Sequence, residues 1–252
     1  MPVKAILCLA LVYLMSALGA VITEDSASAN ALSGVTLLSS SVSDFALSPT
    51  IPATGSAFSY HFPYSMADAG VYSLNTASAI APFIVSGGAS FLGNQDYRLQ
   101  DFHLGLALHL DEFSLGYSQH YIYEKISTDD SYSTWTGDLA LSFRGVEYGT
   151  EVKLLRMGTQ DVELHLTASS IFVPGVMGAS TYVYAPHGED SYRFATSFDV
   201  ADLFEVQTSW QNEPPRFGAG LKFRLFSGEL MYAIRTHSEL SLSHSLDIGF
   251  VW

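Results

Sequence analysis

The sequence predicts an all-β protein: a transmembrane, antiparallel, up-and-down β-barrel of about 14 strands that follows a short N-terminal lead segment or plug. Two observations predict this fold class. From residue 56 onward, apolar and polar residues alternate with a period of two, which is the pattern of strands with one apolar face. The chain is also 48% hydrophobic and only 14% charged, yet it contains no run of about 18 apolar residues that would make a membrane helix.

Alternating strands also occur in soluble β-sandwiches, so strand length and the polar faces must decide between the two folds. The predicted strands are mostly about 10 to 14 residues long, whereas sandwich strands commonly have about 5 to 6 residues and tilted membrane strands need about 9 to 11. Their polar faces carry charges at mid-strand. Burying these charges in a dry sandwich core would cost several kcal/mol each, but a polar lumen accommodates them. Both features favour the membrane barrel.

Residues 1–20 have the layout of a secretory signal peptide, with Lys4, an apolar run from Ala5 to Leu18, and an ending of small residues at Ala20. The apolar run is too short for a comfortable membrane span of about 20 residues. We expect cleavage near Ala20 and a mature protein in the bacterial outer membrane. The single cysteine, Cys8, lies in this segment, so the mature chain would form no disulfide.

Residues 21–55 form a separate N-terminal periplasmic or plug segment. They are rich in Ser and Ala, contain Pro49 and Pro52, and show no sustained alternation. Residues 26–40 are compatible with a short helix or plug in the mouth of the barrel. The small, polar composition is equally that of a mobile periplasmic tail. The sequence leaves both arrangements open.

The barrel is predicted over residues 56–252, with strands separated by clusters of Gly, Pro, Asn and Asp. The second and third strands are rich in Ala and Ser and are divided by Pro82, so 12 strands is the alternative count. The expected strands are 56–65, 70–80, 83–93, 100–111, 113–126, 135–145, 147–157, 161–173, 176–186, 190–201, 203–213, 216–226, 229–238 and 240–252.

Alternation assigns each strand residue to one of the two faces. The residues expected to face lipid are Phe102, Leu104, Leu106, Leu108, Leu242, Leu246 and Ile248. The polar residues expected to line the lumen are Asp101, His103, His109, Glu124, Asp138, Arg144, Glu151, Lys153, Glu163, Arg193, Lys222, Arg224, Arg235 and Asp247.

The connections between strands alternate in length. They are longer around 94–99, 127–134, 187–189 and 214–215, and tight at 112, 174–175, 202 and 227–228. Long outward loops and short periplasmic turns are typical of outer-membrane barrels. An even number of strands brings the C-terminus back to the periplasmic side. There Phe250 and Trp252 end the last strand and resemble the signal that the barrel-assembly machinery reads.

The charged and polar residues do not indicate a reaction. A net charge of -14 excludes nucleic acid as a partner, because binding to phosphates needs basic residues. His103 and His109 share a face but lie about 20 Å apart along the strand, which is too far to bind one metal ion. No spacing singles out a catalytic nucleophile. We therefore expect no enzyme activity, no catalytic residues, no metal and no cofactor.

Several short segments carry a resemblance to a known family. They are Ala31-Leu32-Ser33-Gly34 with Ser48-Pro49-Thr50 in the lead segment, then Tyr97-Arg98, Leu115-Gly116-Tyr117 and the ending at 239–246. With the barrel pattern, they resemble the PorV and PorQ outer-membrane proteins of type IX secretion and, more distantly, the fatty-acid transporter FadL. Only the proline of that family's Asn-Pro-Ala motif is present, as Pro49.

The resemblance implies two kinds of function. Similarity to FadL implies a transporter or channel for small hydrophobic or other small solutes. Similarity to PorV and PorQ implies a non-enzymatic platform, associated with secretion or structural, that binds a partner protein. The expected partners are outer-membrane lipid, the barrel-assembly machinery, and either a small hydrophobic solute or a secreted protein.

Overall fold

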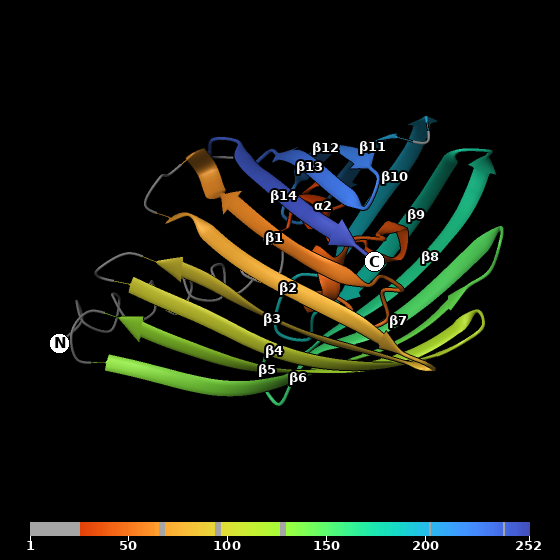
Figure 1. Cartoon of the computed structure of the whole chain (residues 1–252). Coiled ribbons are helices and arrows are strands. Elements are labelled where there is room, and N and C mark those ends of the chain that lie inside the picture. The colour runs from red at the N-terminus through yellow and green to blue at the C-terminus, as the bar shows by residue number, and fades with distance from the viewer. Residues whose placement is uncertain (1–25, 66–68, 94–96, 127–129, 202, 239) are drawn as a thin grey trace.

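The computed structural model describes residues 26–65, 69–93, 97–126, 130–201, 203–238 and 240–252 (Figure 1). The signal peptide expected over residues 1–20 lies outside the described residues. Within the described part of the chain, no helix is long and apolar enough to cross a membrane.

The chain forms a closed antiparallel barrel in which every strand pairs with its sequence neighbours and β1 pairs with β14 (Figure 1). This confirms the predicted barrel of 14 strands, and the alternative of 12 is wrong. The strands are β1 (Gly55–Phe62), β2 (Val71–Ile80), β3 (Phe83–Gly93), β4 (Tyr97–Leu110), β5 (Phe113–Ile126), β6 (Asp130–Arg144), β7 (Tyr148–Met157), β8 (Glu163–Val173), β9 (Val176–Tyr184), β10 (Ser191–Ala201), β11 (Phe204–Gln211), β12 (Arg216–Leu225), β13 (Gly228–Arg235) and β14 (Ser243–Val251).

Two strand boundaries differ from the prediction in an informative way. β6 begins at Asp130 rather than residue 135, because its ladder with β5 continues as far as Ile126. β14 begins at Ser243 rather than residue 240. The carbonyl of Leu242 accepts a hydrogen bond of 3.0 Å from the Ser65 hydroxyl, so this residue joins the connection beside the start of β2 instead of the ladder. Leu242 is exposed, as a lipid-facing residue would be, but it lies just before β14 rather than within the strand.

Neighbouring residues along a strand differ sharply in exposure. On β4, His103 is 2% exposed whereas the adjacent Leu104 is 72% exposed. The same alternation runs around the barrel, so its outer surface is a continuous belt of exposed Leu, Phe, Tyr, Val and Ile side chains. An apolar surface of this extent is unfavourable in water, whereas it matches the hydrocarbon of a bilayer. The barrel is therefore built to span a membrane.

The connections differ in length at the two ends of the barrel. Those that follow even-numbered strands have two or three residues, and those that follow odd-numbered strands have three to eight. The chain enters β1 and leaves β14 at the end with the short turns, because Gly55 pairs with Val251. This is the periplasmic end of outer-membrane barrels.

Residues before β1 lie inside the barrel. They form α2 (Ala27–Ala31) and two 3₁₀ helices, η1 (Thr36–Leu38) and η2 (Val42–Ala46). The Ser26 hydroxyl caps α2 by accepting from the backbone N–H of Ala29. Figure 1 shows this segment, in red and orange, enclosed by the strands. Apart from Ser40 and Pro52, residues 26–53 are all buried. We call residues 26–53 the plug.

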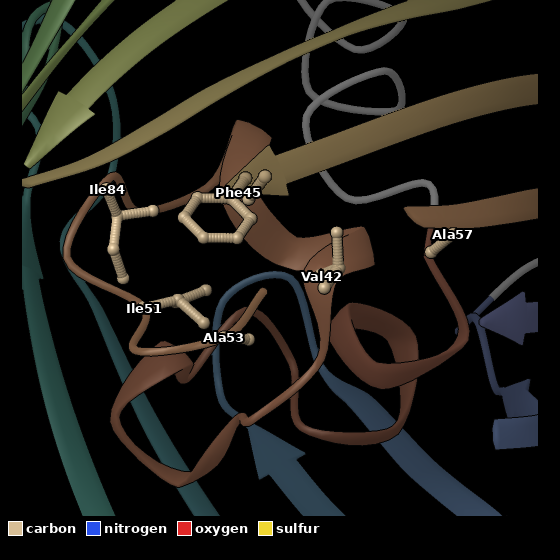
Figure 2. Close-up of a cluster of buried hydrophobic side chains, with 7 residues drawn as sticks. Val42, Phe45, Ile51, Ala53, Ala57 and Ile84 are labelled. Carbon is tan, nitrogen blue, oxygen red and sulfur yellow. The ribbon is translucent and has the colours of Figure 1, made fainter. Parts of the chain in front are cut away.

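The apolar core of the protein lies between the plug and the barrel wall. Phe45 and Val42 of η2 pack with Ile51 and with Ile84 of β3 (Figure 2). A second cluster joins residues around Leu32 and Val35 to β9 and β10. A third joins α2 to β13. A further cluster, of Val71, Leu92 and Leu99, lies within the wall itself. The other three clusters depend on the plug.

Replacing Leu106→Arg should destabilise the barrel by about 2 to 4 kcal/mol, because it places a charge near the middle of the hydrocarbon. Leu110→Arg, on the same face but beside the short turn, should cost about 0 to 1 kcal/mol. Denaturant unfolding in lipid vesicles measures both values. Equal stabilities of the two variants would contradict the assigned membrane position.

Deleting Trp252 should lower the yield of assembled barrel in the outer membrane. Its carbonyl accepts from the Thr54 hydroxyl, and its backbone N–H donates to Thr54 O at 3.4 Å, so it also fastens the seam between the first and last strands. The measurement is the fraction of protein that resists unfolding in cold detergent on a gel. Trp252→Phe, which keeps a terminal aromatic residue, is the control and should assemble normally.

Candidate functional site

The candidate site is the lumen, which the plug and the inner wall fill together. Most polar residues expected to line the lumen are buried there: Asp101, His103, Asp138, Glu151, Lys153, Arg193, Lys222, Arg235 and Asp247. The others lie on the same inward faces but are only partly buried: His109, Glu124, Arg144, Glu163 and Arg224.

The residues expected to face lipid lie on the outer face. Leu104 and Leu106 are the most exposed of them on β4, and Leu108 is partly covered. Phe102, Leu246 and Ile248 are also exposed, as are Phe250 and Trp252 at the end of the chain. The outer surface therefore offers apolar contact with lipid, and the chemistry of the protein lies inside.

Charge is distributed unevenly around the lumen. Among the described residues, the inward faces of β1 to β5 carry no Lys or Arg, and their acidic residues are Asp101 and Glu124. β14 and β6 add Asp247 and Asp138 on either side. The basic side chains gather on the opposite wall, on β7, β10, β12 and β13, with Arg144 at the periplasmic end of β6. These are Lys153, Arg193, Arg216, Lys222, Arg224 and Arg235.

We call the part of the wall that carries these Lys and Arg side chains the basic wall. It binds the plug by donating hydrogen bonds to backbone carbonyls and to hydroxyls of the plug. Arg144 donates to the carbonyl of Leu37 at 2.8 Å, and Arg193 donates to the carbonyl of Ser33 at 2.9 Å. Lys222 donates to the Ser40 hydroxyl at 3.2 Å. These cations satisfy acceptors that short helices leave open at their ends. The plug therefore needs no acidic residues of its own to bind this wall.

Glu151 is the main acidic anchor of the plug. Its two oxygens accept hydrogen bonds from the hydroxyls of Thr36 at 2.6 Å, Ser48 at 2.8 Å and Thr50 at 2.9 Å. The Lys153 ammonium lies 3.8 Å from the same carboxylate and donates to the Thr36 hydroxyl at 2.8 Å. All five side chains are buried. A buried ion pair is tolerated only where further hydrogen bonds satisfy it, and here the plug supplies them.

Asp247 of β14 is the second acidic anchor. It accepts from the backbone N–H of Ala27 and from the hydroxyl of Ser43, each at 2.9 Å. The first of these bonds satisfies an N–H of the first turn of α2, which has no partner within the helix. Asp44, the acidic residue of the plug, instead accepts from the hydroxyls of Ser26 and Ser39 and ties the plug together.

Glycines in the wall allow the plug backbone to approach closely. A Cβ atom at Gly218 would lie 2.3 Å from the carbonyl oxygen of Asn30, and one at Gly220 would lie 2.6 Å from the Cβ of Ala31. Any larger residue at these positions would push α2 off β12. The sequence pattern shows these glycines only as positions without a side chain on the polar face of β12. In the structure they form part of the surface against which the plug packs.

A second constellation lies on β4, β5 and β6, away from the basic wall. The His120 Nδ1 lies 3.0 Å from Asp101, and its Nε2 lies 3.3 Å from Asp138. His103 stacks on His120 with ring centroids 5.3 Å apart. An ionised carboxylate only accepts hydrogen bonds, so His120 donates to both carboxylates when each of its ring nitrogens carries a proton, which is the cationic form. We call Asp101, His120 and Asp138 the lumen triad.

Sequence reasoning singled out Asp101, His103 and Asp138 but missed His120. A signal was present, because β4 and β5 are joined by a turn at residues 111–112. His103 and His120 lie equally far before and after this turn, so they should pair across the hairpin, as the register confirms. The partners of Glu151 and Asp247 in the plug carried no such signal. Among the described residues, no group of three or more His, Cys, Asp or Glu side chains has an arrangement that could hold a metal ion.

Comparison with known proteins bears on the fold. No protein-family model matches the sequence, and no curated protein matches it. A mutant of the Rh. blastica porin resembles the structure with a TM-score of 0.50 and 5% identity, over 79% of this chain and 99% of that chain. The fold is that of the porins. The KdgM porin gives a TM-score of 0.44 and 8% identity over 79% of this chain and 99% of its own.

At such low identity the likeness to porins concerns the fold alone. Together with the apolar belt and the short-turn end, a porin-like barrel of 14 strands indicates an outer-membrane protein. The solute, partner and mechanism have to be argued from the lumen of this chain.

Replacing Glu151→Ala should release the plug without unfolding the barrel. It removes the acceptor of three plug hydroxyls and the carboxylate beside Lys153, and breaking such a buried pair costs about 3 to 5 kcal/mol. Hydrogen exchange of peptides that cover residues 36–50 should become faster, while the strands stay protected.

The matched control is Glu163→Ala. Glu163 pairs with Arg156 and His165 on the wall, so exchange over residues 36–50 should stay as in the original protein. Unchanged exchange in the Glu151 variant would show that this anchor does not hold the plug.

Proposed function

We propose that the protein is an outer-membrane transporter or channel for small solutes, closed by the plug and opened when the plug shifts. The observation that carries the proposal is the nature of the contact between plug and wall. Wall charges meet plug hydroxyls and carbonyls from β6, β7, β10, β12, β13 and β14. A segment that only completed a core would instead bury apolar surface throughout.

Contacts of this kind suit a segment that moves. Water can replace each hydroxyl or carbonyl partner of a wall charge, because a hydrogen bond to a charged group contributes a net free energy of only about 1.5 to 3 kcal/mol. Most plug residues at the wall are Ser, Thr, Asn and Ala, which are small and leave little apolar area exposed when displaced. The largest apolar cluster of the plug lies around Phe45 on β1 to β3, with smaller ones on β9, β10 and β13, which supports a plug that pivots around Phe45.

The lining of the lumen supports a polar solute over a hydrophobic one. Both the basic wall and the wall that carries the lumen triad are polar, and an apolar solute would leave these groups without partners. Resemblance of the lead segment and strands to PorV, PorQ and FadL supports placing the protein near that group. We propose this relationship on the sequence motifs alone.

The alternative function, a platform for a secreted or structural partner protein, has less support. The longest connections at the outward end are residues 63–70 and 236–242, with eight and seven residues. Loops of this size offer a small surface, whereas stable protein interfaces bury about 800 Å² on each partner. The partners that we propose are outer-membrane lipid, the barrel-assembly machinery during insertion, and a small solute.

The proposed opening can be tested by locking the plug with a disulfide. The hydroxyls of Ser33 in the plug and Ser209 on β11 lie 2.8 Å apart, a separation compatible with disulfide geometry. In a variant with Ser33→Cys and Ser209→Cys, oxidation should abolish the flux of small polar solutes into vesicles. Reduction should restore the flux.

The two single-cysteine variants are the controls, and their flux should not respond to oxidation. The one natural cysteine, Cys8, lies in the expected signal peptide and would not compete. Flux that persists through a fully cross-linked barrel would show that the plug need not move. Absence of flux in every variant, reduced or oxidised, would overturn the transport proposal itself.

A further inference from the structure

A row of inward-facing residues crosses β2 to β5 beside the plug. In the ladder, Asn75 pairs with Gly88, Gly88 with His103, and His103 with His120. Asn75 is 1% exposed, and both histidines are 2% exposed. The row therefore brings an amide and two imidazole rings together on the wall opposite the basic side chains.

Gly88 lets two of these side chains meet. A Cβ atom at this position would lie 2.2 Å from Oδ1 of Asn75 and 2.6 Å from Cε1 of His103. The amide oxygen and the imidazole ring thus converge over the bare backbone of β3. A side chain at residue 88 would separate them, so the absence of a Cβ is what forms this pair.

The converging atoms are polar atoms without hydrogen-bond partners. Oδ1 of Asn75 and both ring nitrogens of His103 make no hydrogen bond within the described part of the chain. In a neutral imidazole one nitrogen accepts and the other is an N–H donor, so Asn75 and His103 together present two acceptors and one donor. Burying polar atoms unpaired costs free energy, and a solute with at least two donor hydrogens would satisfy the two acceptors.

The surrounding charge selects the kind of donor. The lumen triad has two carboxylates and one imidazolium, which leaves a net charge of -1, and its His120 stacks against His103 at 5.3 Å. Of the described inward-facing residues on β1 to β5, none is Lys or Arg. A buried negative charge of this kind attracts a cation more strongly than in water, because the local dielectric constant is lower.

We propose that Asn75, His103 and the lumen triad form a binding site for a small organic cation that carries an ammonium group. The ammonium donates to Oδ1 of Asn75 and to a ring nitrogen of His103, and the triad supplies the compensating charge. This proposal rests on the proposed function and names the class of solute that the lumen takes.

The site also touches the plug. Nδ2 of Asn75 donates to the backbone carbonyl of Ser43 at 3.1 Å, and Ser43 in turn holds Asp247. An ammonium bound at Oδ1 pulls on the same amide that holds η2. Occupancy of the site is thereby coupled to the seating of the plug.

Calorimetric titration of the full-length barrel in detergent micelles tests the proposal. The probe is n-propylammonium chloride, and 1-propanol is the uncharged control of nearly equal shape. Propylammonium should bind and propanol should not. His103→Phe keeps the ring that stacks on His120 but removes both nitrogens, so it should weaken propylammonium binding by about tenfold or more.

His237→Phe is the matched control, because His237 lies in the connection after β13 and contacts Tyr64 rather than the site. It should bind propylammonium as the original protein does. Asp101→Asn is a second variant in case His103→Phe misfolds, and it should also weaken binding by removing the net charge of the triad. Equal binding of propanol and propylammonium, or unchanged binding in the variants, would overturn the proposal.

Binding in micelles requires no transport, so the two proposals can fail separately. A barrel that binds propylammonium but passes no solute would overturn only the proposed function. A barrel that passes solutes under control of the plug, yet fails the binding comparison, would overturn only the ammonium site.

Discussion

Closure of the backbone ladder between β1 and β14 is the constraint on which the rest of the structure depends. In hydrocarbon, every unpaired backbone N–H or C=O costs several kcal/mol, so a membrane sheet has to close on itself. The pairing of Gly55 with Val251 through Phe62 with His244 completes this ring. Once it is closed, each strand has one face in lipid and one in the lumen. The period of two in the sequence corresponds to these two faces.

The closed ring creates a second problem that the plug resolves. The inner wall carries Glu151, Lys153, Lys222 and Asp247 in a space where they are almost completely buried, and isolated buried charges are costly. The plug brings hydroxyls, backbone N–H groups and carbonyls to these charges. Its small residues and the bare backbone at Gly218 and Gly220 let it fit. Wall and plug are therefore two halves of one polar core, which is assembled from the barrel interior and the N-terminal segment of the same chain.

This arrangement links stability to function. Hydrogen bonds between hydroxyls, carbonyls and charged groups can be exchanged for water, whereas the apolar cluster around Phe45 cannot be exchanged so cheaply. The wall of β1 to β5 contacts the plug at His61, Asn75 and Ile84. Among the described residues, no hydrogen bond joins the plug to His103 or to the lumen triad beside it. Under the proposed function, one wall of the lumen holds the plug and the other would bind the solute.

Much of the fold could be predicted from the sequence, because the face of a strand and the position of a tight turn are local properties. The alternation of Phe102, His103 and Leu104 determined which side chains meet lipid, and the spacing of turns determined the 14 strands. The location of the plug and its partners was decided only by the tertiary structure. Thr36 and Glu151 are 115 residues apart, and Ala27 and Asp247 are 220 apart. No local pattern records such contacts, since they exist only after the barrel has closed around the segment that precedes it.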